Sequence, residues 1–346
     1  MKKLILVLLM LSFLTVPASA NQIVAPEIPD EVEDLFPEQQ DSFSDGLWHI
    51  LTSVIGTLQP QVASAAGLCS GLLAVAMLLS LLRTYEGKSK ALVELASVVG
   101  VACLMMGSAK SMITLSAKTI QDISHYGRLL LPVLTAALAA QGGVTSSTAL
   151  YAGTALFDSV LSTLISSVSL PAVYIFLVLS IVNAATEDGM LKKLRDTVKW
   201  ALTWGMKIVL YVFTGYISLT GVISGVADRT ALKATKLAIS SMVPVVGSVL
   251  SDASETILVS AATVKSATGV YGLLAIIAIT VTPFLTIGLT YLLLKLTVAL
   301  AAVFAPKQMT GLMEDFTTAM GILSGMTGTV CLLQMISIVC FLKGMG

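Results

Sequence analysis

The sequence predicts an all-α fold, a polytopic bundle of helices that spans a membrane. Hydrophobic residues make up 56% of the 346 residues and charged residues only 12%, about half the charge of a soluble globular domain. The apolar residues gather in runs near the length of about 20 residues that crosses a bilayer as a helix. Charged residues gather between these runs, so the composition excludes a soluble enzyme.

The first residues have the pattern of a secretory signal peptide. Two lysines precede an apolar run that ends at Val16, and Ala18 and Ala20 stand where signal peptidase requires small residues. The run is too short for a span, and Pro17 interrupts it. We expect residues 1–20 to be removed by cleavage after Ala20, which places the mature N-terminus on the extracytoplasmic side.

An acidic extracytoplasmic leader is predicted over residues 21–61. It holds eight Asp or Glu residues and, as far as Pro60, no Lys or Arg. Three prolines before Phe43 and a sparse apolar content predict an extended, solvated segment. A strip that docks a basic extracytoplasmic partner is the alternative.

A helical membrane domain with about seven spans is predicted over residues 62–343. The spans are expected at residues 65–82, 91–109, 170–186, 200–226, 270–305 (a tight hairpin of two short spans, with one kinked long helix as the alternative) and 318–342. Bases outnumber acids in the loops before residues 91 and 200, so both loops are expected in the cytoplasm. Lys343 after the last span favours a cytoplasmic C-terminus.

Three more segments are predicted to be helical without forming ordinary spans. Residues 129–140 are apolar but too few for a span and include Pro132, which predicts a re-entrant or interfacial helix. Residues 145–169 place an apolar stripe opposite hydroxyls and Asp158, which predicts an amphipathic helix. Its polar face either packs on other helices or lines a wet cavity. A second amphipathic segment is expected at about residues 228–268.

Three glycine pairs have the spacing that lets helix backbones approach closely in lipid. They are Gly67 and Gly71, Gly221 and Gly225, and Gly321 and Gly325. We expect them to pack helices within one bundle, with packing between copies in a homo-oligomer as the alternative. The sequence contains no P-loop, HExxH or GxSxG motif, so we expect no catalytic activity, cofactor, metal or nucleic acid.

The most specific stretch is an ungapped block, ADRTALKATK at residues 227–236, followed by PVVG at residues 244–247 and LSDASET at residues 250–256. Its most informative residues are Asp228, Arg229, Thr230, Lys233, Lys236, Pro244, Val245, Val246, Gly247 and Asp252. Asp228 is placed to cap a helix, Pro244 to break it and Gly247 to allow a turn. We expect a helix-turn-helix on the extracytoplasmic face that is either a connector or a partner-docking element.

This block resembles the stage III sporulation protein AE family. So does the order of the elements along the chain, from the signal peptide through the early spans and the block to Pro283, and the resemblance extends over roughly residues 60–343. The resemblance implies a polytopic subunit of the channel between mother cell and forespore, in the mother-cell-derived membrane and needed for late forespore development. It also implies partners: a secretion-type ATPase, ring proteins of the intermembrane space and a forespore-side protein. The substrate and the lining of the conduit do not follow from it.

Two other functions compete with the one that the resemblance implies. The first is an autonomous secondary transporter for a small solute, which usually needs ionisable groups deep in the bilayer. Glu94 and Lys207 lie near predicted span ends, and Lys295 is the exception. The second is an intramembrane enzyme, for which no base is positioned to activate one of the many serines.

Overall fold

The computed structural model describes residues 43–84, 90–140, 144–186, 189–219 and 267–344, together with Pro26, Pro29 and Leu35. Within these residues the regular elements are helices and none is a strand, which confirms the predicted all-α class. The helices are α2 (Phe43–Thr84), α3 (Lys90–Ala140), α4 (Val144–Leu164), η2 (Ile165–Ser169), α5 (Leu170–Thr186), α6 (Gly189–Leu219), α9 (Ala267–Ala301) and α10 (Lys307–Gly344).

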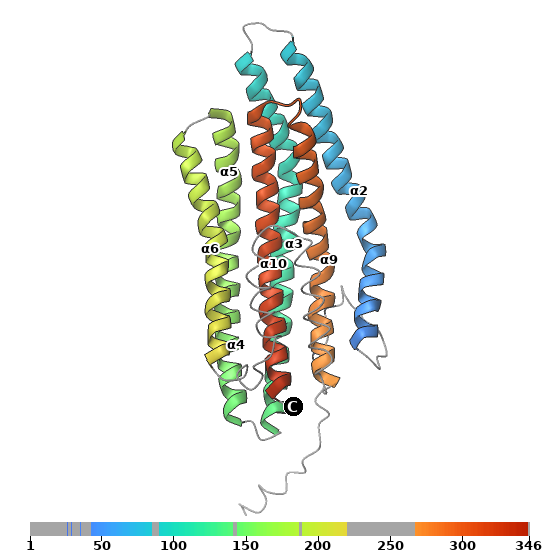
Figure 1. Ribbon diagram of the computed structural model, residues 1–346, viewed down its shortest axis with the longest axis vertical. Coiled ribbons are helices and arrows are strands. Elements are labelled where there is room, and N and C mark those ends of the chain that lie inside the picture. The colour runs from blue at the N-terminus through green and yellow to red at the C-terminus, as the bar shows by residue number, and fades with distance from the viewer. Residues whose placement is uncertain are drawn as a thin grey trace, which may run out of the picture.

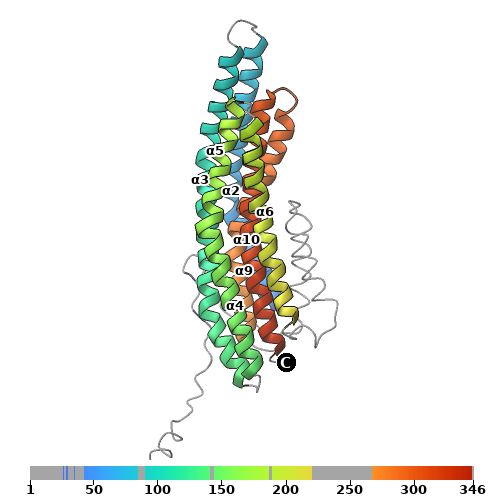
Figure 2. The ribbon, with the colours of Figure 1, turned by 90° about the vertical axis from the view of Figure 1, so that its left-hand side faces the viewer.

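The helices run side by side along the long axis of one bundle (Figures 1 and 2). Helices α2 and α3 form a long antiparallel pair, and α4, η2 and α5 follow one another along a single line. Helix α6 returns beside α5, and α9 and α10 form a second antiparallel pair. The start of α2 and the C-terminal end of α10 lie at the same end of the bundle (Figure 1).

Five helical segments are long and apolar enough to cross a membrane: Phe43–Leu81, Val93–Leu138, Leu150–Thr186, Gly269–Ala301 and Lys307–Lys343. This finding supports a membrane protein, but the described residues do not reproduce the count of about seven spans. The predicted span at residues 200–226 begins inside α6 and continues beyond the described residues.

The predicted hairpin at residues 270–305 is wrong, because these residues form one helix, α9, as far as Ala301. Pro283 lies inside that helix, as the single-helix alternative required. Residues 273–279 are all buried, as expected for a helix that is apolar on every side. Continuing the helix past Pro283 buries apolar surface against α2, α3 and α10, and the chain turns only at residues 302–306.

The predicted re-entrant helix at residues 129–140 is also absent as a separate element, because α3 runs without a break to Ala140. Pro132 lies inside α3 and removes the backbone hydrogen bond to the carbonyl of Arg128. Leu130, Leu131 and Leu134 around it are buried in the core. Their packing outweighs the one lost hydrogen bond, so the helix continues.

The helical part begins earlier than the predicted boundary at residue 62. Helix α2 starts at Phe43 and contains Pro60, so nearly half of the predicted leader, residues 43–61, belongs to a helix. Up to Ser64 the exposed side of α2 mixes polar residues with Trp48 and Ile55, and near its end the exposed residues are the apolar Met77, Leu78 and Leu81.

Helix α3 is much longer than a bilayer requires. At 1.5 Å per residue its 51 residues extend for about 75 Å, against about 30 Å of bilayer hydrocarbon. Its exposed side chains near the loop after α2 are apolar, at Leu95, Val99 and Leu104. Between Lys110 and Arg128 its exposed side chains are polar, and beyond them Leu129 and Pro132 are exposed as well. The bundle therefore extends well beyond one bilayer thickness.

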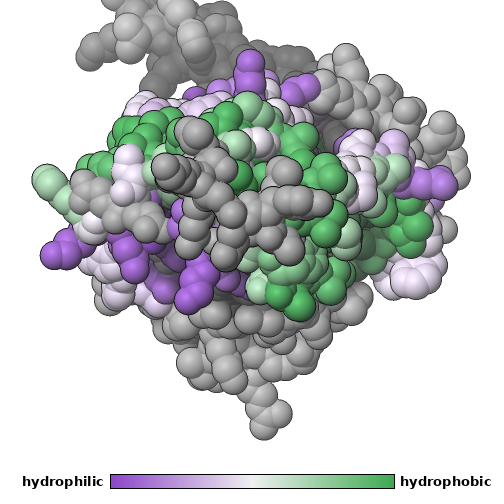
Figure 3. Space-filling view, turned by 90° about the horizontal axis from the view of Figure 1, so that it is seen from above, coloured by the Kyte–Doolittle hydropathy of each residue, from purple (hydrophilic) through white to green (hydrophobic). Residues whose placement is uncertain are grey.

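Seen from the end where α2 meets α3, the bundle is unevenly polar (Figure 3). Hydrophobic residues cover much of the visible surface, and hydrophilic residues gather on the side where α5 and α6 lie. Helix α6 supplies exposed charges there, at Lys192, Lys193, Asp196 and Lys199. This end of the molecule thus carries a localised basic surface.

Candidate functional site

The strongest candidate site is a buried carboxylate, Asp158, held between three helices. Asp158 projects from α4 and its side chain is only 2% exposed. The side-chain amide of Gln334 on α10 donates to one carboxylate oxygen over 2.7 Å. Nε of Arg128 on α3 lies 3.4 Å from the other oxygen. We call Arg128, Asp158 and Gln334 the Asp158 cluster.

A glycine on α3 makes room for this arrangement. The Gln334 side chain lies directly over Gly127, where an added Cβ would stand 2.5 Å from Gln334 Nε2. No real Cβ contact is that short, so any larger residue at position 127 would displace the amide that Asp158 accepts. The absence of a side chain at Gly127 therefore allows α10 to approach α3 at this level.

Three buried polar atoms, one in the Asp158 cluster and two close to it in sequence, have no hydrogen-bond partner among the described residues. They are Oε1 of Gln334, Oγ1 of Thr154 and the hydroxyl of Tyr126. Burying such groups unpaired costs free energy. Arg128 is 59% exposed, so it connects the buried carboxylate to the surface. The cluster can hold a charge and orient three helices; it contains no nucleophile paired with a base.

Aromatic packing fixes α4 on its other side. The ring of Phe157 meets the ring of Phe213 edge-on at 5.3 Å between centroids, and the ring of Tyr216 at 5.6 Å. Tyr216 also lies over Gly153, where a Cβ would clash with its ring. Asp158 is therefore held between a polar contact with α3 and α10 and an aromatic contact with α6.

The chain changes its helical geometry shortly after Asp158, at the end of α4. Residues Ile165–Ser169 form one turn of π-helix, η2, between α4 and α5, and Pro171 is the second residue after it. Such π turns occur frequently at functional sites. Ile165 and Ser169 remain buried, so the chain passes from α4 to α5 without leaving the core.

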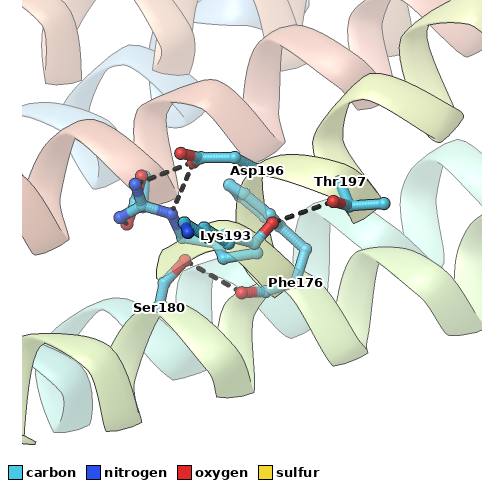
Figure 4. Close-up of polar contacts among 7 residues, drawn as sticks. Phe176, Ser180, Lys193, Asp196 and Thr197 are labelled. Carbon is cyan, nitrogen blue, oxygen red and sulfur yellow. Dashed lines mark hydrogen bonds and ion pairs between the residues drawn. The ribbon is translucent and has the colours of Figure 1, made fainter. Parts of the chain in front are cut away.

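A second charged cluster ties α6 to α10 near the loop end of the bundle (Figure 4). Nη1 of Arg195 lies 2.7 Å from an oxygen of Asp315, and Nη2 lies 2.8 Å from an oxygen of Asp196. Burial would lower the pKa of Arg195, but its hydrogen bond with Asp196 and the charge of Asp315 raise it above the ordinary value. Arg195 therefore stays charged, and it joins α6 to α10 through Asp315, which lies 120 residues further along the chain.

On the helices around Arg195, hydroxyl groups donate hydrogen bonds to backbone carbonyls of their own helix. Ser180 on α5 donates to the carbonyl of Phe176 over 2.8 Å, and Thr197 donates to the carbonyl of Lys193 over 2.9 Å (Figure 4). Below this level Trp200 and Trp204 lie exposed with their rings 6.2 Å apart. Such an aromatic pair beside a basic stretch is typical of a membrane interface.

All ten residues of the predicted motif lie outside the described residues. These are Asp228, Arg229, Thr230, Lys233, Lys236, Pro244, Val245, Val246, Gly247 and Asp252, and with them Gly221, Gly225, Ala18 and Ala20. The glycine pairs that are described make no close contact within the bundle at Gly67, Gly71 or Gly325, where an added Cβ would meet nothing within 4 Å. Gly321 is partly buried on α10.

The sequence pointed to Asp158 only as part of a polar face. Its partners lie 30 and 176 residues away, and no local spacing indicates them. The Arg195 cluster was visible only as part of a basic loop. Within the described part of the chain, no group of three or more His, Cys, Asp or Glu residues could hold a metal ion.

Together, the long apolar helices, the basic loop end and the buried charged clusters define a polytopic α-helical membrane protein. Residues 30–344 match the model of the family described as stage III sporulation protein AE. The chain belongs to that family.

A curated relative is stage III sporulation protein AE of Bacillus subtilis (strain 168), which is 25% identical over 197 residues. The alignment covers 57% of this chain and 49% of the relative, so the chain spans about half the length of the curated relative it matches. No solved structure matches this chain.

Proposed function

We propose that this chain is a platform or permease-like membrane subunit of a transport or secretion channel between mother cell and forespore, required for late forespore development. The observation that carries this proposal is the family match, which covers residues 30–344 and hence nearly the whole bundle.

A platform needs rigid surfaces beyond the bilayer, and the bundle is long enough to supply them. The charged tie between Arg195 and Asp315 stiffens the end that carries the basic loops. We place that end in the cytoplasm by the positive-inside rule, where a secretion-type ATPase would meet it. The opposite end would face ring proteins of the intermembrane space and a forespore-side partner.

We further propose that the protein lies in the mother-cell-derived membrane with both the mature N-terminus and the C-terminus outside the cytoplasm. The start of α2 and the end of α10 lie at one end of the bundle (Figure 1), opposite the basic loops. This orientation replaces the cytoplasmic C-terminus that Lys343 suggested, because a bundle with its basic loops inside places Lys343 outside. The motif at residues 228–252 remains a candidate docking element on that side.

Gene deletion in the native spore-former tests the proposed function. We expect arrest after engulfment, a silent late forespore reporter and normal vegetative growth, all restored by the wild-type gene. Normal spores from the deletion strain would contradict the channel role. A nutrient-dependent defect of vegetative cells would favour the transporter instead.

The Asp158 cluster keeps the autonomous transporter as a second candidate. Asp158 lies in a segment apolar enough to cross a membrane, and buried carboxylates in such segments often carry protons or ions. Replacing Asp158 with Asn keeps shape and removes the charge. A folded D158N protein that supports normal sporulation would exclude a coupling role; loss of function despite normal folding would favour one.

A further inference from the structure

The exposed surface of α2 and α3 is apolar over one bilayer thickness, counted from the loop that joins them. Between positions 95 and 109 of α3 the exposed residues are Leu95, Ala96, Val99, Cys103, Leu104 and Gly107, and from Lys110 as far as position 128 they are polar. On α2 the exposed residues after Ser64 are small or apolar apart from Ser70. Lys110 follows Lys90 by 20 residues and Ser64 precedes Thr84 by 20 residues, so both stretches extend for about 30 Å, the thickness of the hydrocarbon.

The outer face of α6 is charged near its loop and apolar further along. Its exposed charges are Lys192, Lys193, Asp196 and Lys199. The exposed Trp200 and Trp204 follow them, and beyond these the exposed large side chains are Ile208, Tyr211 and Val212. The ammonium of Lys207 lies 5.7 Å from the centre of the Trp204 ring, so this side chain extends toward the charged end, as a lysine does just below a membrane surface. Charges, an aromatic pair and then an apolar face follow one another as they do at a membrane border.

Contacts with α10 place α3 and α6 on a common scale of depth. On α3, the hydroxyl of Ser116 lies 3.0 Å from that of Thr327, and Gly127 packs against the side chain of Gln334. The two contacts follow in the same order along both helices, so α3 and α10 run in the same direction. Asp315 lies 12 residues before Thr327 and 19 residues before Gln334, and it is therefore level with positions 104–108 of α3.

At two levels of the bundle the outer faces of α3 and α6 differ in polarity. Arg195 of α6 is paired with that aspartate and lies at its level; there α3 exposes Leu104, whereas α6 exposes Asp196. Both helices run away from the loop end (Figure 1). Thirteen residues further along, α6 exposes Ile208 and α3 exposes Gln121. A membrane at right angles to the helices would put a charged or polar face into hydrocarbon at one level or the other.

We propose that the bundle crosses the membrane at a tilt, so that hydrocarbon covers positions 91–109 of α3 on one side and α6 from Trp200 onward on the other. Trp200 follows Arg195 by five residues and is level with positions 109–113 of α3, about 21–27 Å deeper than Leu95. The three helices α3, α10 and α6 together are about 30 Å wide. This offset corresponds to a tilt of roughly 35–40°, at the upper end of the range for membrane helices.

The tilt also places the exposed edge of the Asp158 cluster outside the hydrocarbon. Arg128, which is 59% exposed, lies 18 residues beyond Lys110, about 27 Å further along α3. In the orientation proposed above, Arg128 therefore stands in extracytoplasmic water. The carboxylate of Asp158 is reached from that side, through Arg128, and not from the lipid.

Spin labels at two level-matched pairs test the tilt on the full mature chain in nanodiscs. The pairs are L104C with D196C and Q121C with I208C, each in a chain whose four native cysteines are replaced by alanine. We expect collisions with oxygen, which is more soluble in hydrocarbon, at L104C and I208C, and collisions with a water-soluble nickel chelate at D196C and Q121C. An upright bundle would give both members of a pair the same environment and would overturn the proposal. A label at I208C that meets neither reagent would show that protein covers α6, which would overturn it as well.

Hydroxyl-radical footprinting tests the same claim without substitutions. Met190 is 78% exposed near the charged start of α6, and Tyr211 is 42% exposed in its apolar part. Relative to the denatured chain, we expect Tyr211 in nanodiscs to be protected several-fold more than Met190, well beyond the about twofold difference between their exposed fractions. Stronger protection of Met190 would place the charged start of α6 in hydrocarbon and contradict the tilt. Neither measurement depends on the channel role, so these tests and the deletion experiment fail independently.

Discussion

Gly127 determines how closely the amide of Gln334 approaches Asp158. In G127A the new Cβ would displace that amide, and an unmade buried hydrogen bond costs about 1–3 kcal/mol. The higher helix propensity of Ala offsets at most about 1 kcal/mol. We expect a net loss of thermal stability, measured as the melting temperature of the detergent-purified protein.

The matched control is Gly71 on α2, where an added Cβ would meet nothing within 4 Å. G71A should be neutral or more stable by up to about 1 kcal/mol, because only helix propensity changes. Equal destabilisation by G71A and G127A would mean that Gly71 packs against another copy of the chain, as the glycine-pair alternative supposes. A stable G127A protein would contradict the close packing over Gly127.

Asp158 should matter more as a hydrogen-bond acceptor than as a charge. D158N retains an oxygen for Gln334, and its lost ion pair involves Arg128, which is 59% exposed, so we expect a loss below about 1 kcal/mol. D158L leaves the amide of Gln334 unpaired and should cost about 1–3 kcal/mol. Denaturant or thermal unfolding of both variants checks the order. A D158N protein as unstable as D158L would show that the charge itself holds the three helices.

Helix boundaries show how much of the fold the sequence could predict. Apolar content and charge position predicted an all-α membrane protein, and the long apolar helices agree. The sequence could not predict that α3 and α9 continue through Pro132 and Pro283, because continuation depends on neighbouring helices that bury apolar residues before and after each proline. For the same reason the partners of Asp158, on α3 and α10, could not be read from local spacing.

Replacing Pro132 tests the continuity of α3. P132A restores the backbone donor to the carbonyl of Arg128 and should raise the melting temperature, because an interior proline costs about 3 kcal/mol relative to Ala. A136P, one turn further along the exposed side of α3, adds the same defect and should lower it. If P132A destabilised the protein, the break predicted from the sequence would be correct after all.

The whole bundle has its basic loops at one end and the start of α2 and the C-terminus at the other. Fusions to alkaline phosphatase, which is active only outside the cytoplasm, test the proposed orientation. We expect an active fusion at the C-terminus and an inactive fusion in the loop between α5 and α6. An inactive C-terminal fusion would restore the prediction based on Lys343 and would require a further crossing among residues 220–266.

Membership of a channel complex is the central claim, and copurification from sporulating cells tests it most directly. The tagged wild-type chain, solubilised after engulfment, should bring down the ring proteins and the secretion-type ATPase. The variant K192E/K193E, changed on the cytoplasmic surface, should lose the ATPase and retain the ring proteins. A wild-type chain that purifies free of both, from cells in which both are present, would contradict the claim.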